Sequence, residues 1–127
     1  MSLLNLKQLQ KGSYSWKRYL AQVMEENIHL KNRLSQAVTT TAEKMSLEAM
    51  EKFHTRSIRQ DDILSLLKHD IAEFDKLLLR VKPADKQLVQ KVELALKKNR
   101  NNIKAFSKEF DELKTSFNSY LHESING

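Results

Sequence analysis

The sequence contains no cysteine, a single proline and only two glycines among 127 residues. The lack of cysteine excludes a disulfide-stabilised scaffold, a catalytic thiol and any zinc or iron–sulfur site with thiolate ligands. So few prolines and glycines argue against a β-sandwich, a β-barrel and a glycine-rich phosphate-binding loop. No run approaches the ~20 apolar residues that a membrane-spanning helix needs.

Composition and length indicate one folded domain over residues 1–127. Charged residues make up 30% of the chain and hydrophobic residues 40%, which is too apolar for a disordered chain. A chain of this length normally forms a single domain. Lys7 and Gln8 stand where a signal peptide would need its apolar core. We therefore expect a cytoplasmic protein that engages no membrane.

The first helix is predicted over residues 14–38. Ser13 can cap a helix that begins near Tyr14, which leaves residues 1–12 as an N-terminal arm or a short helix. Beyond this point apolar residues recur in steps of three and four, as on one side of a helix, with Asn27 as the interruption. The stripe consists of Trp16, Leu20, Val23, Leu30, Leu34 and Ala37.

Three successive threonines, at positions 39–41, interrupt this pattern. Thr40 and Glu43 fit a capping box, in which the Thr40 hydroxyl accepts a hydrogen bond from the Glu43 amide. We predict a turn here, followed by a second helix over residues 41–81. The alternative is one unbroken helix, because neither glycine nor proline marks the boundary.

The single proline, Pro83, separates the second helix from a third that is predicted over residues 84–123. Both helices carry apolar seams with three–four spacing, and a seven-residue repeat of this length predicts coiled-coil packing. If the chain reverses near Pro83, Met50 lies opposite Phe117. An acidic stretch over 61–75 would then face a basic stretch over 91–104. The predicted fold class is all-α, an antiparallel bundle of three long helices.

The first helix is predicted to cover only part of the other two. Folded back at residues 39–41, it places Trp16 near Leu64 and leaves a broad apolar stripe uncovered beyond that point, which usually marks an interface. We expect a homodimer in which two such ends form a four-helix bundle. The alternative cover is the leucine-rich N-terminal piece. The predicted self-association residues are Leu67, Ile71, Phe74, Leu78, Val92 and Leu96.

Two Glu-x-x-His pairs, Glu26–His29 and Glu51–His54, are candidates for a metal site. Di-iron carboxylate bundles use two such pairs that point inward, but His29 and Glu51 lie far from the apolar stripes of their helices. We therefore expect no metal, no other cofactor and no catalytic residue, and we predict that the chain is not an enzyme.

Three other polar features of the helices have structural interpretations. His69 and Glu73 are four residues apart, which favours a contact within one helix. Asn27 and Asn99 occupy seam positions, where a buried asparagine commonly fixes the register of a helix pair.

Positive charge is concentrated between residues 80 and 108, where nine bases stand against two acids. We predict a non-catalytic interaction or scaffold protein that acts through helix packing and self-association, with a protein partner as a further possibility. The first alternative is binding of nucleic acid or another acidic partner, and the second is a metal-binding bundle. Nucleic acid is less favoured, because no aromatic residue interleaves with these bases. The predicted basic face consists of Lys91, Lys97, Lys98, Arg100 and Lys104.

Residues 26–34 (ENIHLKNRL) and 61–71 (DDILSLLKHDI) resemble segments of small bacterial helical-bundle proteins of no assigned activity. The resemblance implies a helical fold over most of the chain. It implies no activity and transfers no functional residue.

Overall fold

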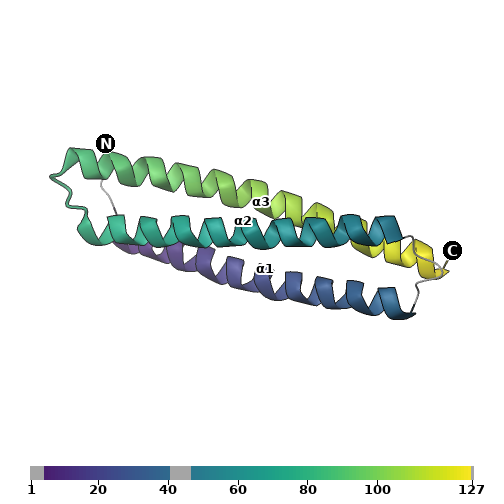
Figure 1. The fold of residues 1–127 in the computed structure, drawn as a ribbon. Helices are drawn as coiled ribbons and strands as arrows, with labels where there is room; N and C mark the ends of the chain where they lie inside the picture. The colour runs from purple at the N-terminus through teal and green to yellow at the C-terminus, as the bar shows by residue number, and fades with distance from the viewer. Residues whose placement is uncertain (1–4, 41–46, 127) are drawn as a thin grey trace.

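The computed structural model describes residues 5–40 and 47–126. It contains three helices, α1 (Leu6–Thr40), α2 (Leu47–Arg80) and α3 (Lys86–Asn126), and no strand in the described ranges. The helices lie side by side, and each runs in the opposite direction to the one before it in the chain (Figure 1). The predicted all-α bundle of three long helices is thereby confirmed. Within the described ranges, no helix has both the length and the hydropathy of a membrane span.

The hairpin between α2 and α3 reverses at Pro83, as predicted. Asp85 caps α3, because its Oδ1 accepts a hydrogen bond from the Leu88 amide at 3.1 Å. At the opposite end of the hairpin, the rings of Phe53 and Phe117 lie 5.3 Å apart. The predicted partner of Phe117 was Met50, one helical turn away, so the predicted register holds to within one turn.

The first helix begins eight residues earlier than the predicted start near Tyr14. Asn5 is the cap, because its Oδ1 accepts a hydrogen bond from the Gln8 amide at 3.1 Å. The predicted cap, Ser13, lies buried inside the helix, and its hydroxyl donates to Asp75 Oδ1 at 2.5 Å. Ser13 therefore stabilises the contact between α1 and α2. Residues 6–12 form part of α1 and do not make a separate arm.

Gly12 occupies an interior position of α1 and has no positive φ. A Cβ added at this position would meet nothing within 4 Å. We expect Gly12→Ala to raise the free energy of unfolding by about 0.5–1 kcal/mol, because alanine loses less backbone entropy in a helix than glycine does. Urea unfolding followed by circular dichroism measures this change. The matched reverse change, Ala21→Gly at an exposed position of α1, is expected to lower stability by a similar amount, and equal stability of all three proteins would contradict the expectation.

The first helix continues through the first two threonines of the predicted turn at 39–41. α1 ends at Thr40 and α2 begins at Leu47, and α2 folds back along α1, where Ser13 bonds to Asp75 and Asn27 bonds to Asp61, so the alternative of one unbroken helix is wrong. The predicted start of the second helix at 41 lies outside the described residues. The Thr40–Glu43 capping box lies outside the described residues. α1 lies between two and three turns further along α2 than expected. The prediction placed Trp16 near Leu64, whereas the ring centroids of Trp16 and Phe74 lie 5.6 Å apart.

This displacement of α1 changes what covers the end of the hairpin. The core has two clusters, and the second is built from residues of α2 and α3 together with Val81. Leu6, Leu9 and Trp16 of α1 pack against this second cluster. The apolar end that we expected a second subunit to cover is therefore covered by the first turns of α1. The cluster consists of Phe74, Leu78, Val81, Val89 and Val92.

A polar layer crosses the middle of the core. Asn27 is fully buried, and its Nδ2 donates to the Ser57 carbonyl at 3.0 Å and to Asp61 Oδ1 at 2.8 Å. These bonds form only when α1 and α2 are in one register, so they support the register role that we predicted for Asn27. Asn99 is also buried, as its seam position predicted.

Candidate functional site

The predicted basic face lies on the outer side of α3. Val92, Asn99 and Phe106 occupy the buried side of this helix. Bases at other positions of the helical repeat therefore project into solvent. All five residues of the basic face are exposed: Lys91, Lys97, Lys98, Arg100 and Lys104.

Acidic residues of α2 pair with α1, where we had expected α3. Lys31 Nζ lies 2.6 Å from Asp61 Oδ2, and Lys17 forms a salt bridge with Asp75. The prediction that the acidic stretch of α2 faces the bases of α3 is wrong for these two acids. The reason is the register of α1, which brings its own lysines to the acids of α2.

Within the described ranges, most of the basic face consequently lacks a counter-charge. Lys98 Nζ lies 3.8 Å from Asp70 Oδ2, which is the predicted pairing of α2 with α3. Lys91, Lys97, Arg100 and Lys104 form no ion pair with any residue that the structure describes. Their charge is available to an external anion.

A groove of about 580 Å³ between α1 and α3 runs beside the basic face. Trp16 and Tyr19 form its α1 wall. The sequence shows no aromatic residue among the bases of α3, and the structure supplies two from another helix. Sequence reasoning missed this site because only the register of α1 against α3 brings the two sets together. The α3 wall consists of Arg100, Ile103, Lys104, Ser107, Lys108 and Asp111.

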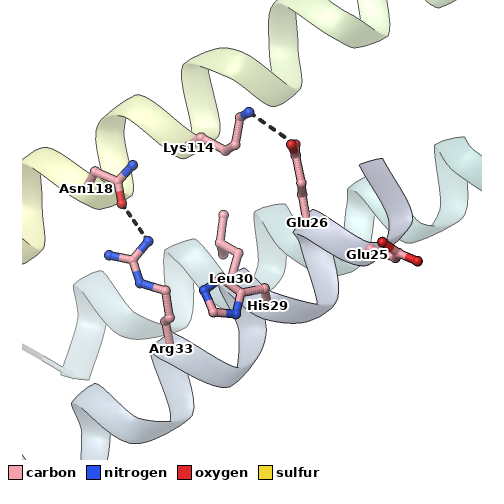
Figure 2. Close-up of a pocket in the computed structure, with 7 residues that line it drawn as sticks. All are labelled: Glu25, Glu26, His29, Leu30, Arg33, Lys114 and Asn118. Atoms are coloured by element: carbon pink, nitrogen blue, oxygen red, sulfur yellow. Dashed lines mark hydrogen bonds and ion pairs between the residues drawn. The ribbon is translucent and has the colours of Figure 1, made fainter. Parts of the chain in front are cut away.

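Towards the C-terminal end of α1, polar bridges join α1 to α3. Lys114 Nζ lies 3.1 Å from Glu26 Oε2, and Arg33 Nη1 donates to Asn118 Oδ1 at 2.7 Å. Figure 2 shows these two bridges spanning the two helices, with Glu25 directed away from them. The depression that they line measures about 360 Å³. Both of its cations are engaged with the protein, unlike those of the groove.

The two Glu-x-x-His pairs line separate depressions. Glu26 and His29 lie in the depression of Figure 2, where Glu26 is bound to Lys114. Glu51 and His54 lie in another depression, between α1 and α2. Among the described residues, no three histidine, aspartate or glutamate side chains are grouped as a metal site would require. Elemental analysis of the purified protein tests the metal-binding alternative directly.

Glu73 takes its hydrogen bond from Lys76, at 3.1 Å, where the sequence suggested a contact with His69. The Lys76 hydrogen bond and positive charge lower the pKa of Glu73, and the charge of His69 adds a smaller effect in the same direction. Glu73 is exposed, so this pairing is a surface contact within α2.

The residues predicted for self-association lie inside the single chain. Leu96 is half-buried, and the other five are buried: Leu67, Ile71, Phe74, Leu78 and Val92. These side chains already pack within one chain, so they cannot also form an interface unless α1 moves away. The homodimer stays a prediction, which native mass spectrometry tests.

No family model, no curated protein and no solved structure matches this chain. The resemblance to small bacterial helical proteins stays a prediction. Function is therefore inferred from the residues and their geometry.

Proposed function

We propose that this protein is a non-catalytic helical scaffold that binds a polyanionic partner through the basic face of α3. One observation carries the proposal: Lys91, Lys97, Arg100 and Lys104 are exposed and have no counter-charge within the described residues. The whole chain has a net charge of +6, which adds long-range attraction for an anion. A polyanion that contacts these cations releases bound counterions, and this release favours binding most strongly at low salt.

The bundle holds these cations on a rigid support. Phe106 and Phe110, on the opposite side of α3, are almost completely buried in the core. Arg100 and Lys104 stand one turn apart, and Lys97 extends the row by about one more turn, which is ~10 Å in all at ~1.5 Å per residue. A fixed row of charges suits a partner that carries several negative charges in succession. Self-association is the weaker candidate, because the residues predicted for it are buried.

A salt titration with heparin, a generic polyanion, tests the proposal. We expect binding at low salt and a linear fall of log K with log salt concentration. Changing Lys97, Arg100 and Lys104 to alanine is expected to reduce the slope of that line by about 2, because each lost contact removes roughly 0.7–0.9. Fluorescence anisotropy with labelled heparin measures both quantities.

The matched control changes three exposed lysines of α2, Lys52, Lys68 and Lys76, to alanine. This variant loses the same net charge but keeps the basic face, so its slope should equal that of the unmodified protein. The proposal fails if the unmodified protein does not bind heparin at low salt. It also fails if the two triple variants weaken binding equally.

A further inference from the structure

The groove between α1 and α3 combines aromatic rings with unpaired cations. Trp16 and Tyr19 lie on its α1 side, and Arg100, Lys104 and Lys108 lie on its α3 side. Proteins that bind single-stranded nucleic acid without sequence preference use this combination, in which bases stack on aromatic rings while cations follow the phosphates. We propose that the groove binds single-stranded nucleic acid. This inference rests on the proposed polyanion binding and names the class of partner.

The two rings are held in position by the core. The ring of Trp16 packs against Phe74 at 5.6 Å with an interplanar angle of 54°. Tyr19 packs against the other core cluster, which includes Leu20, Leu64 and Phe106. Both side chains are half-buried, so each keeps part of its surface towards the groove. A ring that is already immobilised loses little conformational entropy when a base stacks on it.

The cations of the groove are not used by the fold. Arg100, Lys104 and Lys108 are exposed, and they form no ion pair with a described residue. They follow one another at four-residue intervals, about 6 Å apart along the helix axis. Asp111 closes the row with a negative charge that disfavours a further phosphate. From Arg100 to Asp111 the groove is about 16 Å long, which accommodates roughly five stacked nucleotides at ~3.4 Å each.

The aromatic wall decides between the possible polyanions. In a duplex the faces of the bases are covered by their stacked neighbours, so Trp16 and Tyr19 could contribute nothing to binding. An acidic peptide would satisfy the cations but has no planar base to place against the rings. The described helices are also much longer than those of a helix-turn-helix module, which reads a duplex through its major groove. A single strand uses both walls of the groove.

Trp16 is the only tryptophan in the chain, so its fluorescence reports on the groove directly. We expect a labelled ten-nucleotide thymidine strand to quench Trp16 fluorescence and to bind more tightly than a hairpin duplex with an equal number of phosphates. A ten-residue polyglutamate peptide should not quench it. Tyr19→Leu, which keeps apolar packing but removes the ring, should weaken the single strand about 5- to 100-fold and leave heparin binding unchanged.

The control is Tyr14→Leu, because Tyr14 is exposed on the same helix but does not line the groove. This variant should bind the strand as the unmodified protein does. Equal binding of strand and duplex, tighter binding of polyglutamate, or no effect of Tyr19→Leu would each overturn the inference. If heparin still binds through the basic face in those cases, the proposed function stands. If heparin does not bind at low salt, both proposals fall.

Discussion

Replacing Phe110 with alanine is expected to lower the free energy of unfolding by about 3–5 kcal/mol. The Phe110 side chain is 1% exposed and stacks on Phe106, with 6.1 Å between ring centroids. Its other contacts include the Lys114 ammonium, which lies 5.3 Å from the ring centroid. Alanine would leave a cavity where the three helices meet, and long helices cannot collapse locally to fill it. Urea unfolding measures the change, and the slope with urea should stay constant.

The control is Leu94→Ala on the same helix. Leu94 is 63% exposed, so its truncation should change stability by no more than about 0.5 kcal/mol. If Phe110→Ala cost no more than Leu94→Ala, the assignment of Phe110 to the core would be contradicted.

The second large effect concerns the first turns of α1. Leu6 and Leu9 pack against the second core cluster and cover the end of the hairpin. We expect the double change Leu6→Ser and Leu9→Ser to lower stability by about 2–3 kcal/mol, because both half-buried leucines lose apolar contact. The variant should also self-associate more than the unmodified protein, because Phe74 and Leu78 would become accessible to a second chain. Native mass spectrometry at matched concentrations compares the two.

The double change Lys7→Ser and Gln10→Ser is the matched control. Both residues are exposed on the same turns of α1, so stability and mass distribution should stay as they are in the unmodified protein. Unchanged stability and mass in the leucine variant would show that the first turns of α1 do not cover the cluster.

The hairpin of α2 and α3 was predictable because its signals are local. Pro83 fixes the point where the chain reverses. The regularly spaced apolar seams of α2 and α3 can then be aligned with each other to within one helical turn. The start of α1 was not predictable in the same way, because Asn5 and Ser13 are both good capping residues. Tertiary packing favours the start at Asn5, because it places Leu6 and Leu9 against the second core cluster. It also lets the Ser13 hydroxyl bond to Asp75.

The candidate site was predictable only in part. Lys97, Arg100 and Lys104 stand opposite the seam of α3, so their exposure follows from helical periodicity. Whether they are paired depends on where the acids of α2 find their partners. Two of those acids, Asp61 and Asp75, form ion pairs with lysines of α1, and Asp70 pairs with Lys98 of α3.

Three helices, their apolar sides and the antiparallel hairpin follow from the amino-acid sequence, because each depends on periodicity and on capping signals within one segment. The position of the first helix along α2 is set by packing between helices and could not be read from any one segment. That position depends on which of several similar apolar stretches of α2 and α3 the stripe of α1 buries. In this position the first turns of α1 cover the end of the hairpin, and an acid of α2 pairs with α1 in place of the bases of α3. The same position brings Trp16 and Tyr19 beside those bases.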